Sequence, residues 1–197
     1  MMNIFRSAIL AGICIGIAGF GYLAIGGIFG AVIFAFGLAA VVSYAFKLYT
    51  GTAGFVKLPA QTCELFVILI GNLVGCLLIS MLTRVSPMPV QDTAQNILAA
   101  RLASGWWRCG LLAIGCGFIM TTAVEFARKN NWYPLLFGVP MFIICGFPHS
   151  IADAFYYMSV PVSFIGENIL KIVPLYVAIV VGNFIGCNVY RVVIPKQ

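Results

Sequence analysis

The stretch GFPHSIADAFYY, Gly146 to Tyr157, interrupts an apolar part of the chain with a proline and two ionisable side chains. Pro148 lacks the N–H group that continues a helix, so a helix that reaches this residue must kink or end. The only histidine of the chain, His149, follows directly, and Asp153 comes about one helical turn later. We therefore predict a helix that breaks at Pro148 and resumes at His149.

The composition places this break in a membrane. Of 197 residues, 62% are hydrophobic and 8% are charged, against about 25% charged residues in soluble domains. A bilayer core of about 30 Å requires roughly 20 apolar residues in each helix, and apolar runs fall at 4–27, 28–48, 62–84, 104–126, 132–147 and 168–194. We expect one all-α transmembrane domain, residues 1–197, with six membrane helices. Ionisable residues inside a membrane are costly and usually functional, which makes the break a candidate site.

A short motif occurs once in each half of the chain. GNLVGC at Gly71–Cys76 lies in the third predicted span, and GNFIGC at Gly182–Cys187 lies in the sixth. The longest polar interruption, residues 84–104, leaves three spans on each side, so a second copy would cross the membrane in the opposite direction. The motif predicts an inverted 3+3 repeat, as in many transport proteins. The alternative is a chance recurrence, since small residues are common where membrane helices touch.

The second predicted span ends in a break that corresponds to the one at Pro148. Its sequence is KLYTGTAGFVKLPA, Lys47 to Ala60. Two broken helices in corresponding positions of an inverted repeat indicate a translocation site. The helix that resumes after each break presents free N–H groups and a positive dipole end, which favour a small anion.

Side chains at the two breaks supply further donors. His149 can attract an anion or donate a proton to it, because imidazole changes charge near neutral pH. Thr50 and Thr52 offer hydroxyl groups from the other break. The alternatives are a hydrogen-bonded structural histidine and threonines that only cap a helix.

Charge and cysteine content exclude several other roles. The net charge is +6 without a basic cluster, so the expected partner is the lipid bilayer rather than nucleic acid. The seven cysteines show no metal-ligand spacing, and we expect neither a metal nor another cofactor. Basic flanks favour a plasma-membrane protein with both termini in the cytoplasm. The expected cytoplasmic side carries six basic residues, Arg6, Lys57, Arg128, Lys129, Arg191 and Lys196. The expected outer side carries four, Arg84, Arg101, Arg108 and Lys171.

Four segments together resemble the formate/nitrite transporter family: LYTG at Leu48–Gly51, GNLVG at Gly71–Gly75, GFPHSIADAF at Gly146–Phe155 and GNFIG at Gly182–Gly186. The resemblance implies a homopentamer of aquaporin-like protomers, each with its own pore. It implies as substrates small monovalent anions such as formate, nitrite and hydrosulfide, or their conjugate acids. The central histidine of the family corresponds to His149 and its loop threonine to Thr50, while its apolar constrictions correspond to Leu48, Tyr49 and Phe142.

Three positions depart from the pattern of that family and predict a divergent branch, with hydrosulfide as a candidate substrate. Tyr49 replaces a phenylalanine and adds a hydroxyl group to a constriction. Lys47 stands where the family has an acid, and Asp153 where it has an asparagine. A lone lysine inside a membrane costs about 2.5–3.5 kcal/mol, so we expect Lys47 and Asp153 to form an ion pair. The alternative is that Lys47 reaches the interface and Asp153 caps its helix locally.

Two other functions remain to be compared with an anion channel. An aquaporin-like channel for neutral solutes would carry paired Asn-Pro-Ala tripeptides, which the sequence lacks. A membrane-embedded hydrolase would use Ser150 with His149 and Asp153, but Ser150 points about 100° away from His149 on one helix. We therefore expect a channel and not an enzyme.

Overall fold

The computed structural model describes residues 1–55, 59 and 61–193, and within these ranges every regular element is helical. The first half contains α1 (Met2–Ile25), α2 (Gly27–Ser43), α3 (Tyr49–Ala53), α4 (Thr62–Ser80) and the 3₁₀ helix η1 (Met81–Arg84). α5 (Val90–Ser104) follows, and the second half contains α6 (Trp106–Arg128), α7 (Tyr133–Ile144), α8 (Ser150–Ser159) and α9 (Val162–Val193). Lys57 and Lys196, two of the charges that were counted for orientation, lie outside the described residues.

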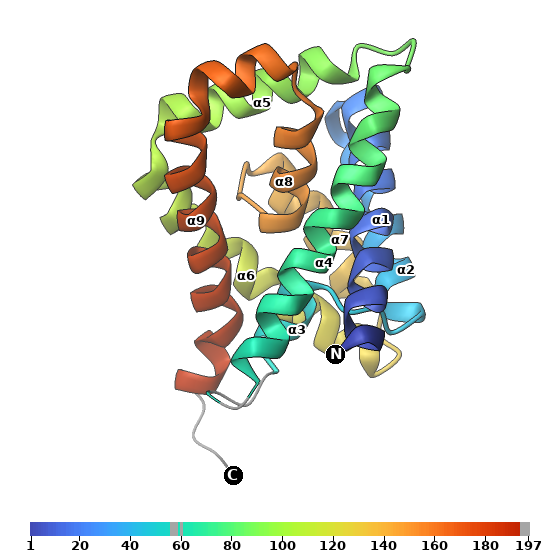
Figure 1. The fold of residues 1–197 in the computed structure, drawn as a ribbon. Coiled ribbons are helices and arrows are strands. Elements are labelled where there is room, and N and C mark those ends of the chain that lie inside the picture. The colour runs from blue at the N-terminus through green and yellow to red at the C-terminus, as the bar shows by residue number, and fades with distance from the viewer. Residues whose placement is uncertain (56–58, 60, 194–197) are drawn as a thin grey trace.

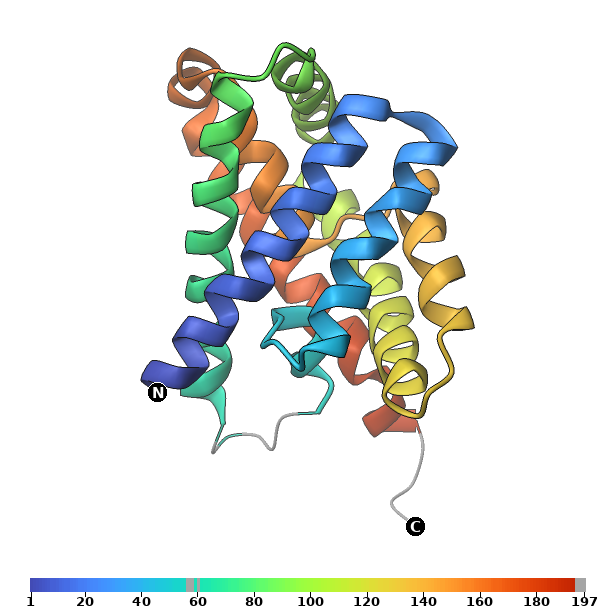
Figure 2. The ribbon, with the colours of Figure 1, turned by 90° about the vertical axis from the view of Figure 1, so that its right-hand side faces the viewer.

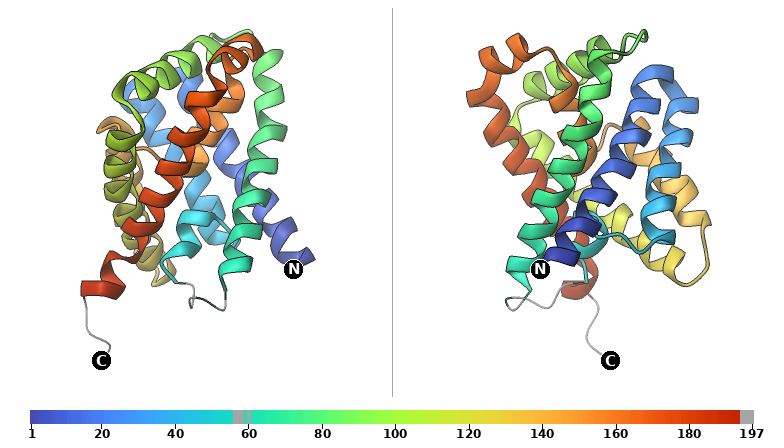
Figure 3. Two further views of the ribbon diagram at one scale, coloured as in Figure 1. Left: turned by 60° about the vertical axis from the view of Figure 1, so that its left-hand side comes forward. Right: turned by 45° about the vertical axis from the view of Figure 1, so that its right-hand side comes forward.

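The order of helices is the same in the two halves. In each half a long helix is followed by a shorter one, a break, a short resumed helix and a second long helix. α1 packs against α4, and α6 packs against α9. In Figure 1 α1 and α4 run upward from the N-terminal side, whereas α6 and α9 run downward, and α5 crosses the upper end. Figures 2 and 3 show α2 and α7, which pack against each other, on the side away from α9.

The predicted spans correspond to apolar helices, with small shifts at their ends. Within the described residues, four helical segments are long and apolar enough to cross a membrane, namely Met2–Ile25, Thr62–Arg84, Trp106–Arg128 and Val162–Val193. Gly27–Ser43 and Tyr133–Ile144 are apolar but shorter, because each ends at one of the two breaks. Many outward side chains of these helices are large and apolar, as a lipid environment requires; Phe29 is 80% exposed and Leu170 88%.

The two helices before the breaks end in the same turn. In α2 the N–H of Phe46 bonds to the carbonyl of Val41, and in α7 the N–H of Phe147 bonds to that of Phe142. Each turn needs one residue with positive φ, which is Gly146 in the second half and Ala45 in the first, at 71° and 53°. Both ends follow the Schellman pattern, in which a left-handed residue reverses the chain. The α5 helix begins at Val90 and has no side-chain cap among the described residues.

The glycines of the repeated motif allow long helices to touch through their backbones. A Cβ atom at Gly75 would collide with the carbonyl oxygen of Ile9 in α1, and one at Gly186 with that of Ile114 in α6. The close approach of helices that the small residues predict is therefore confirmed for contacts within the protomer.

Gly186→Ala should lower the stability of the folded protein by about 1–3 kcal/mol, because the colliding atom belongs to a backbone that cannot rotate away. Gly166, in the same helix, has open space at its Cβ position. There the same change should stabilise the helix by up to about 1 kcal/mol. Thermal unfolding in detergent would measure both variants, and equal shifts would contradict the close approach of α6 and α9.

Candidate functional site

The two breaks meet inside the helical bundle. α3 begins at Tyr49 after the extended residue Leu48, and α8 begins at Ser150 after the extended residue His149. The structure places Thr50 Oγ1 2.9 Å from His149 Nε2, although 99 positions separate the two residues. Both side chains are buried. The contact joins the first turn of α3 to the N-cap of α8.

The hydrogen bonds of His149 determine its neutral tautomer. Nδ1 accepts a hydrogen bond from the N–H of Ala152 at 3.1 Å, so the ring caps α8. An unprotonated Nδ1 places the ring hydrogen on Nε2, which then donates to the hydroxyl oxygen of Thr50. The hydroxyl hydrogen of Thr50 remains a donor, and no acceptor among the described residues is paired with it. The alternative of a hydrogen-bonded structural histidine has this contact behind it, but the contact uses only one ring nitrogen.

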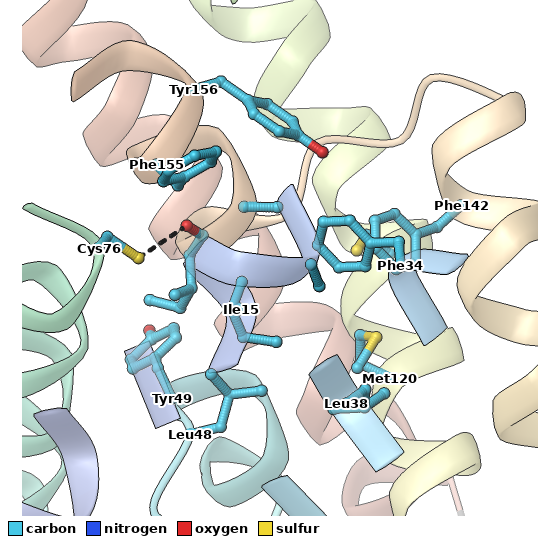
Figure 4. Packing of buried hydrophobic residues seen from close by; sticks show 14 of the residues in the cluster. Ile15, Phe34, Leu38, Leu48, Tyr49, Cys76, Met120, Phe142, Phe155 and Tyr156 are labelled. Carbon is cyan, nitrogen blue, oxygen red and sulfur yellow. Dashed lines mark hydrogen bonds between the residues drawn. The ribbon is translucent and has the colours of Figure 1, made fainter. Parts of the chain in front are cut away.

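Apolar side chains surround this pair. The ring of Phe142 stacks on that of His149 at 5.3 Å between centroids, and Phe34 meets Phe142 edge-on at 6.0 Å. Leu48 is 1% exposed and lies at the start of α3. Figure 4 shows Phe34 and Phe142 side by side in the buried interior.

The Tyr49 hydroxyl, which was predicted to add polarity to a constriction, has a hydrogen-bond partner in the structure. It donates to the backbone carbonyl of Val180 in α9 at 3.3 Å. This hydrogen bond links the start of α3 to α9, and the hydroxyl hydrogen of Tyr49 already has an acceptor. The departure from phenylalanine at this position adds a structural hydrogen bond.

Asn72 satisfies the backbone at the first break. Its Oδ1 accepts from the N–H of Tyr49 at 2.8 Å, while Nδ2 donates to the carbonyls of Lys47 at 2.9 Å and Ala8 at 2.8 Å. The amide belongs to α4, is fully buried, and links the break to α1.

Asn183 does the same at the second break. Its Oδ1 accepts from the N–H of Ser150 at 2.7 Å, and Nδ2 donates to the carbonyls of Pro148 at 3.0 Å and Ala113 at 2.8 Å. The asparagines of the two G-N-x-x-G-C motifs therefore have equivalent roles. Each side chain binds the backbone on both sides of a break, and we call Asn72 and Asn183 the asparagine clamps. Sequence reasoning used the motif only as a sign of repetition and close packing. An amide at the same place in the two apolar motifs was the signal for this second role.

These clamps occupy some of the backbone N–H groups that were expected to await an anion. In α8 the N–H of Ser150 is taken by Asn183, and that of Ala152 by His149. In α3 the N–H of Tyr49 is taken by Asn72. The side-chain donors that the two breaks leave for a ligand are the Thr50 hydroxyl and the His149 ring, beside the remaining N–H groups in the first turns of α3 and α8.

The predicted ion pair between Lys47 and Asp153 is wrong, because Asp153 pairs with Arg101. Its Oδ1 accepts from Arg101 Nε at 3.1 Å and from the Tyr157 hydroxyl at 3.1 Å, and its Oδ2 accepts from the N–H of His149 at 2.8 Å. The last contact confirms the alternative that Asp153 caps its helix locally. Arg101 also donates to the carbonyl of Gly146, so one guanidinium group holds both sides of the break.

Geometry explains why sequence reasoning chose the wrong partner. Arg101 projects from α5, which crosses the upper end of the bundle in Figure 1, and its charge was counted only as a membrane flank. Asp153 and Arg101 line a cavity of about 210 Å³. Lys47 lines a different cavity, of about 290 Å³, together with Thr52 and Arg128. Thr52 therefore lies with Lys47, apart from the Thr50–His149 contact.

Removing one asparagine clamp should destabilise the protein strongly. Asn183→Leu would leave the N–H of Ser150 and the carbonyl of Pro148 unpaired, at a cost of about 1–3 kcal/mol for each buried group. Asn168→Leu in the same helix is the control, since the amide of Asn168 reaches only Phe164 of its own helix. Unfolding in detergent should show a much larger loss for Asn183→Leu, and similar losses would contradict the clamp.

The Arg101–Asp153 pair predicts a non-additive mutant cycle. Arg101→Met should cost about 3 kcal/mol, the lower end of the range for a broken buried pair, because the Arg101 side chain is 17% exposed. The double variant Arg101→Met/Asp153→Asn should recover part of that loss. Lys129→Met, which breaks the exposed pair with Glu125, should cost at most about 0.5 kcal/mol. Coupling of Asp153→Asn to Lys47→Met in place of Arg101→Met would contradict the assignment.

Comparisons with known proteins agree with this geometry. No curated protein matches the chain. Among solved structures, one described as a pentameric formate channel with formate bound is 22% identical, with a TM-score of 0.81 over 96% of this chain and 94% of the other. An ion channel of the FNT family is 18% identical, with a TM-score of 0.68 over 96% of this chain and 87% of the other. At these identities the two likenesses concern the fold.

The family itself follows from the sequence match. The family model described as formate/nitrite transporter matches residues 1–195, and the described part of the chain contains four long apolar helices. The chain is a multi-pass membrane protein that belongs to the formate/nitrite transporter family of channels.

Proposed function

We propose that this channel conducts small monovalent anions of the formate, nitrite and hydrosulfide class, or their conjugate acids, past His149. The observation that carries the proposal is the 2.9 Å contact between Thr50 and His149, where the two breaks meet. The resemblance in fold to a pentameric formate channel supports the substrate class.

The apolar walls of the site suit a substrate that crosses as a neutral acid. An unpaired charge between Leu48 and Phe142 would lose its hydration without compensation, which is costly. A weak-acid anion would lose this penalty by receiving the proton that His149 gives up after the ring has taken a second proton from water, which returns the ring to its neutral form. The Thr50 hydroxyl would orient the acid by donating a hydrogen bond. On this proposal Leu48 and Phe142 exclude hydrated ions, and the His149–Thr50 pair selects anions that can be protonated.

We propose further that the protomer is one domain with six membrane crossings in an inverted, aquaporin-like repeat. The repeated helix order, the opposite directions of α1 and α6, and the equivalent asparagine clamps support this arrangement. A homopentamer in the plasma membrane with both termini in the cytoplasm is the assembly that fits, and a structural relative is described as pentameric.

A hydrolase is disfavoured by the hydrogen bonds of the site. Both nitrogens of His149 are engaged, one with Ala152 and the other with Thr50. Ser150 Oγ is buried and has no hydrogen-bond partner among the described residues. A serine nucleophile would need a base within reach, so we propose a role in permeation only. A neutral-solute channel remains the second candidate, and the flux experiment separates the two.

The test is flux into liposomes that contain the purified protein. The parent should carry formate, nitrite and hydrosulfide much faster than chloride, because chloride stays an anion at all usable pH values. His149→Phe and Thr50→Val should each lower formate flux by at least about tenfold, the equivalent of one charge-assisted hydrogen bond.

Thr93→Val is the matched control for Thr50→Val, since the Thr93 hydroxyl is on α5 and bonds only to the carbonyl of Pro89. It should leave the flux unchanged. Glycerol or water flux in the absence of anion flux would support the neutral-solute channel. Unaltered formate flux in His149→Phe would remove His149 from the pathway.

A further inference from the structure

The two cysteines that end the G-N-x-x-G-C motifs make equivalent contacts. The Cys76 thiol lies 3.5 Å from the carbonyl oxygen of Ile151 and 3.6 Å from that of Gly12. The Cys187 thiol lies 3.4 Å from the carbonyl oxygens of Thr50 and Gly117. Both cysteines are fully buried. Figure 4 shows the contact of Cys76 with the α8 backbone as a dashed line.

The thiols reach across the two halves, whereas the asparagines do not. Asn72 in α4 holds the break before α3, but Cys76 in the same helix contacts α8 of the other half. Conversely, Asn183 holds the break before α8, and Cys187 contacts α3. Each motif therefore touches both resumed helices, one through its amide and the other through its thiol.

We propose that Cys76 and Cys187 are a matched pair of positioning residues that set the Thr50–His149 contact. The Cys187 thiol contacts the backbone carbonyl of Thr50, the residue whose hydroxyl contacts His149. Cys76 holds the carbonyl of Ile151, two positions after His149 in the first turn of α8. A shift of either backbone moves Thr50 Oγ1 relative to His149 Nε2, so the two thiols govern the same distance from opposite sides. The effect on permeation rests on the proposed function.

The contact occurs twice, which is the reason for treating each thiol as a hydrogen-bond donor. A thiol is a weak donor, and one S–H···O contact contributes little. Two such contacts at equivalent positions of two motifs are a repeated geometry, which packing alone does not require. A small side chain such as cysteine also fits the narrow space between the long helices. A Cβ at Gly12 would collide with the carbonyl of Asn72, and one at Gly117 would collide with that of Asn183.

The chain offers a matched control in Cys116. This thiol is fully buried in α6, and in the part of the chain that the structure describes it has no hydrogen-bond partner. Cys116→Ala removes the same atoms as Cys76→Ala and Cys187→Ala without removing a contact to α3 or α8. Any effect of lost volume should be common to all three variants.

The first measurement is independent of transport. Infrared difference spectra between the parent and each alanine variant isolate the S–H stretch of one cysteine, which moves to lower frequency when the thiol donates a hydrogen bond. The bands of Cys76 and Cys187 should lie below that of Cys116. Equal frequencies for the three thiols would overturn the proposal, whether or not the protein conducts anions.

The second measurement is the ratio of formate to nitrite flux in liposomes, which does not depend on how many channels are intact. Cys76→Ala and Cys187→Ala should each change the ratio by about two- to fivefold, the effect expected from one weak hydrogen bond. Cys76→Ser and Cys187→Ser should restore the parental ratio, because a hydroxyl keeps the donor. Cys116→Ala should leave the ratio unchanged.

A Thr50→Val background shows whether Cys187 acts through Thr50. There, Cys187→Ala should have no further effect on the ratio. An unchanged ratio in both single alanine variants, or one that serine fails to restore, would overturn the positioning role. Absence of anion flux in the parent would overturn the proposed function and with it the role in permeation, while the infrared result would still decide the hydrogen bonds.

Discussion

The structure depends on satisfying the backbone of two broken helices inside an apolar bundle. A break at membrane depth leaves N–H and carbonyl groups that water cannot reach, and each unpaired group costs several kcal/mol in such surroundings. Asn72 and Asn183 satisfy them with one acceptor and one amide donor group each. The same amides also donate to backbone carbonyls of α1 and α6. These bonds fix the position of each break along the axis of a neighbouring long helix.

The reach of these amides requires unusually close helices. An asparagine side chain is short, so α4 must lie against α1 and α9 against α6 with no side chains between them. Gly75 and Gly186 permit this, since any Cβ there would meet a backbone carbonyl. Glycine and asparagine in the motif are therefore parts of one arrangement. The cysteine at its end extends that arrangement to the resumed helix of the other half.

The same constraint determines which groups are left for a substrate. The clamps and the His149 ring occupy part of the backbone N–H groups at the meeting point, and the Thr50 hydroxyl and the His149 ring add side-chain donors there. The carboxylate of Asp153 is neutralised by Arg101 and engaged by Tyr157 and the N–H of His149. The two cavities consequently differ in charge: an ion pair lines the one near α5, and Lys47 and Arg128 line the one near α3.

The sequence alone determined the membrane class, the positions of the breaks, the repeated motif and the family, because apolar runs, prolines and short motifs act locally along the chain. It also made His149 and Thr50 candidate site residues, since polar residues beside a break in an apolar span have few roles. Tertiary structure alone decided which partner each polar group finds. Arg101 pairs with Asp153 because α5 folds over the break, and the Tyr49 hydroxyl bonds to Val180 because α9 passes beside α3. Such partners lie far apart in sequence, and their pairing depends on distances that only the packed helices define.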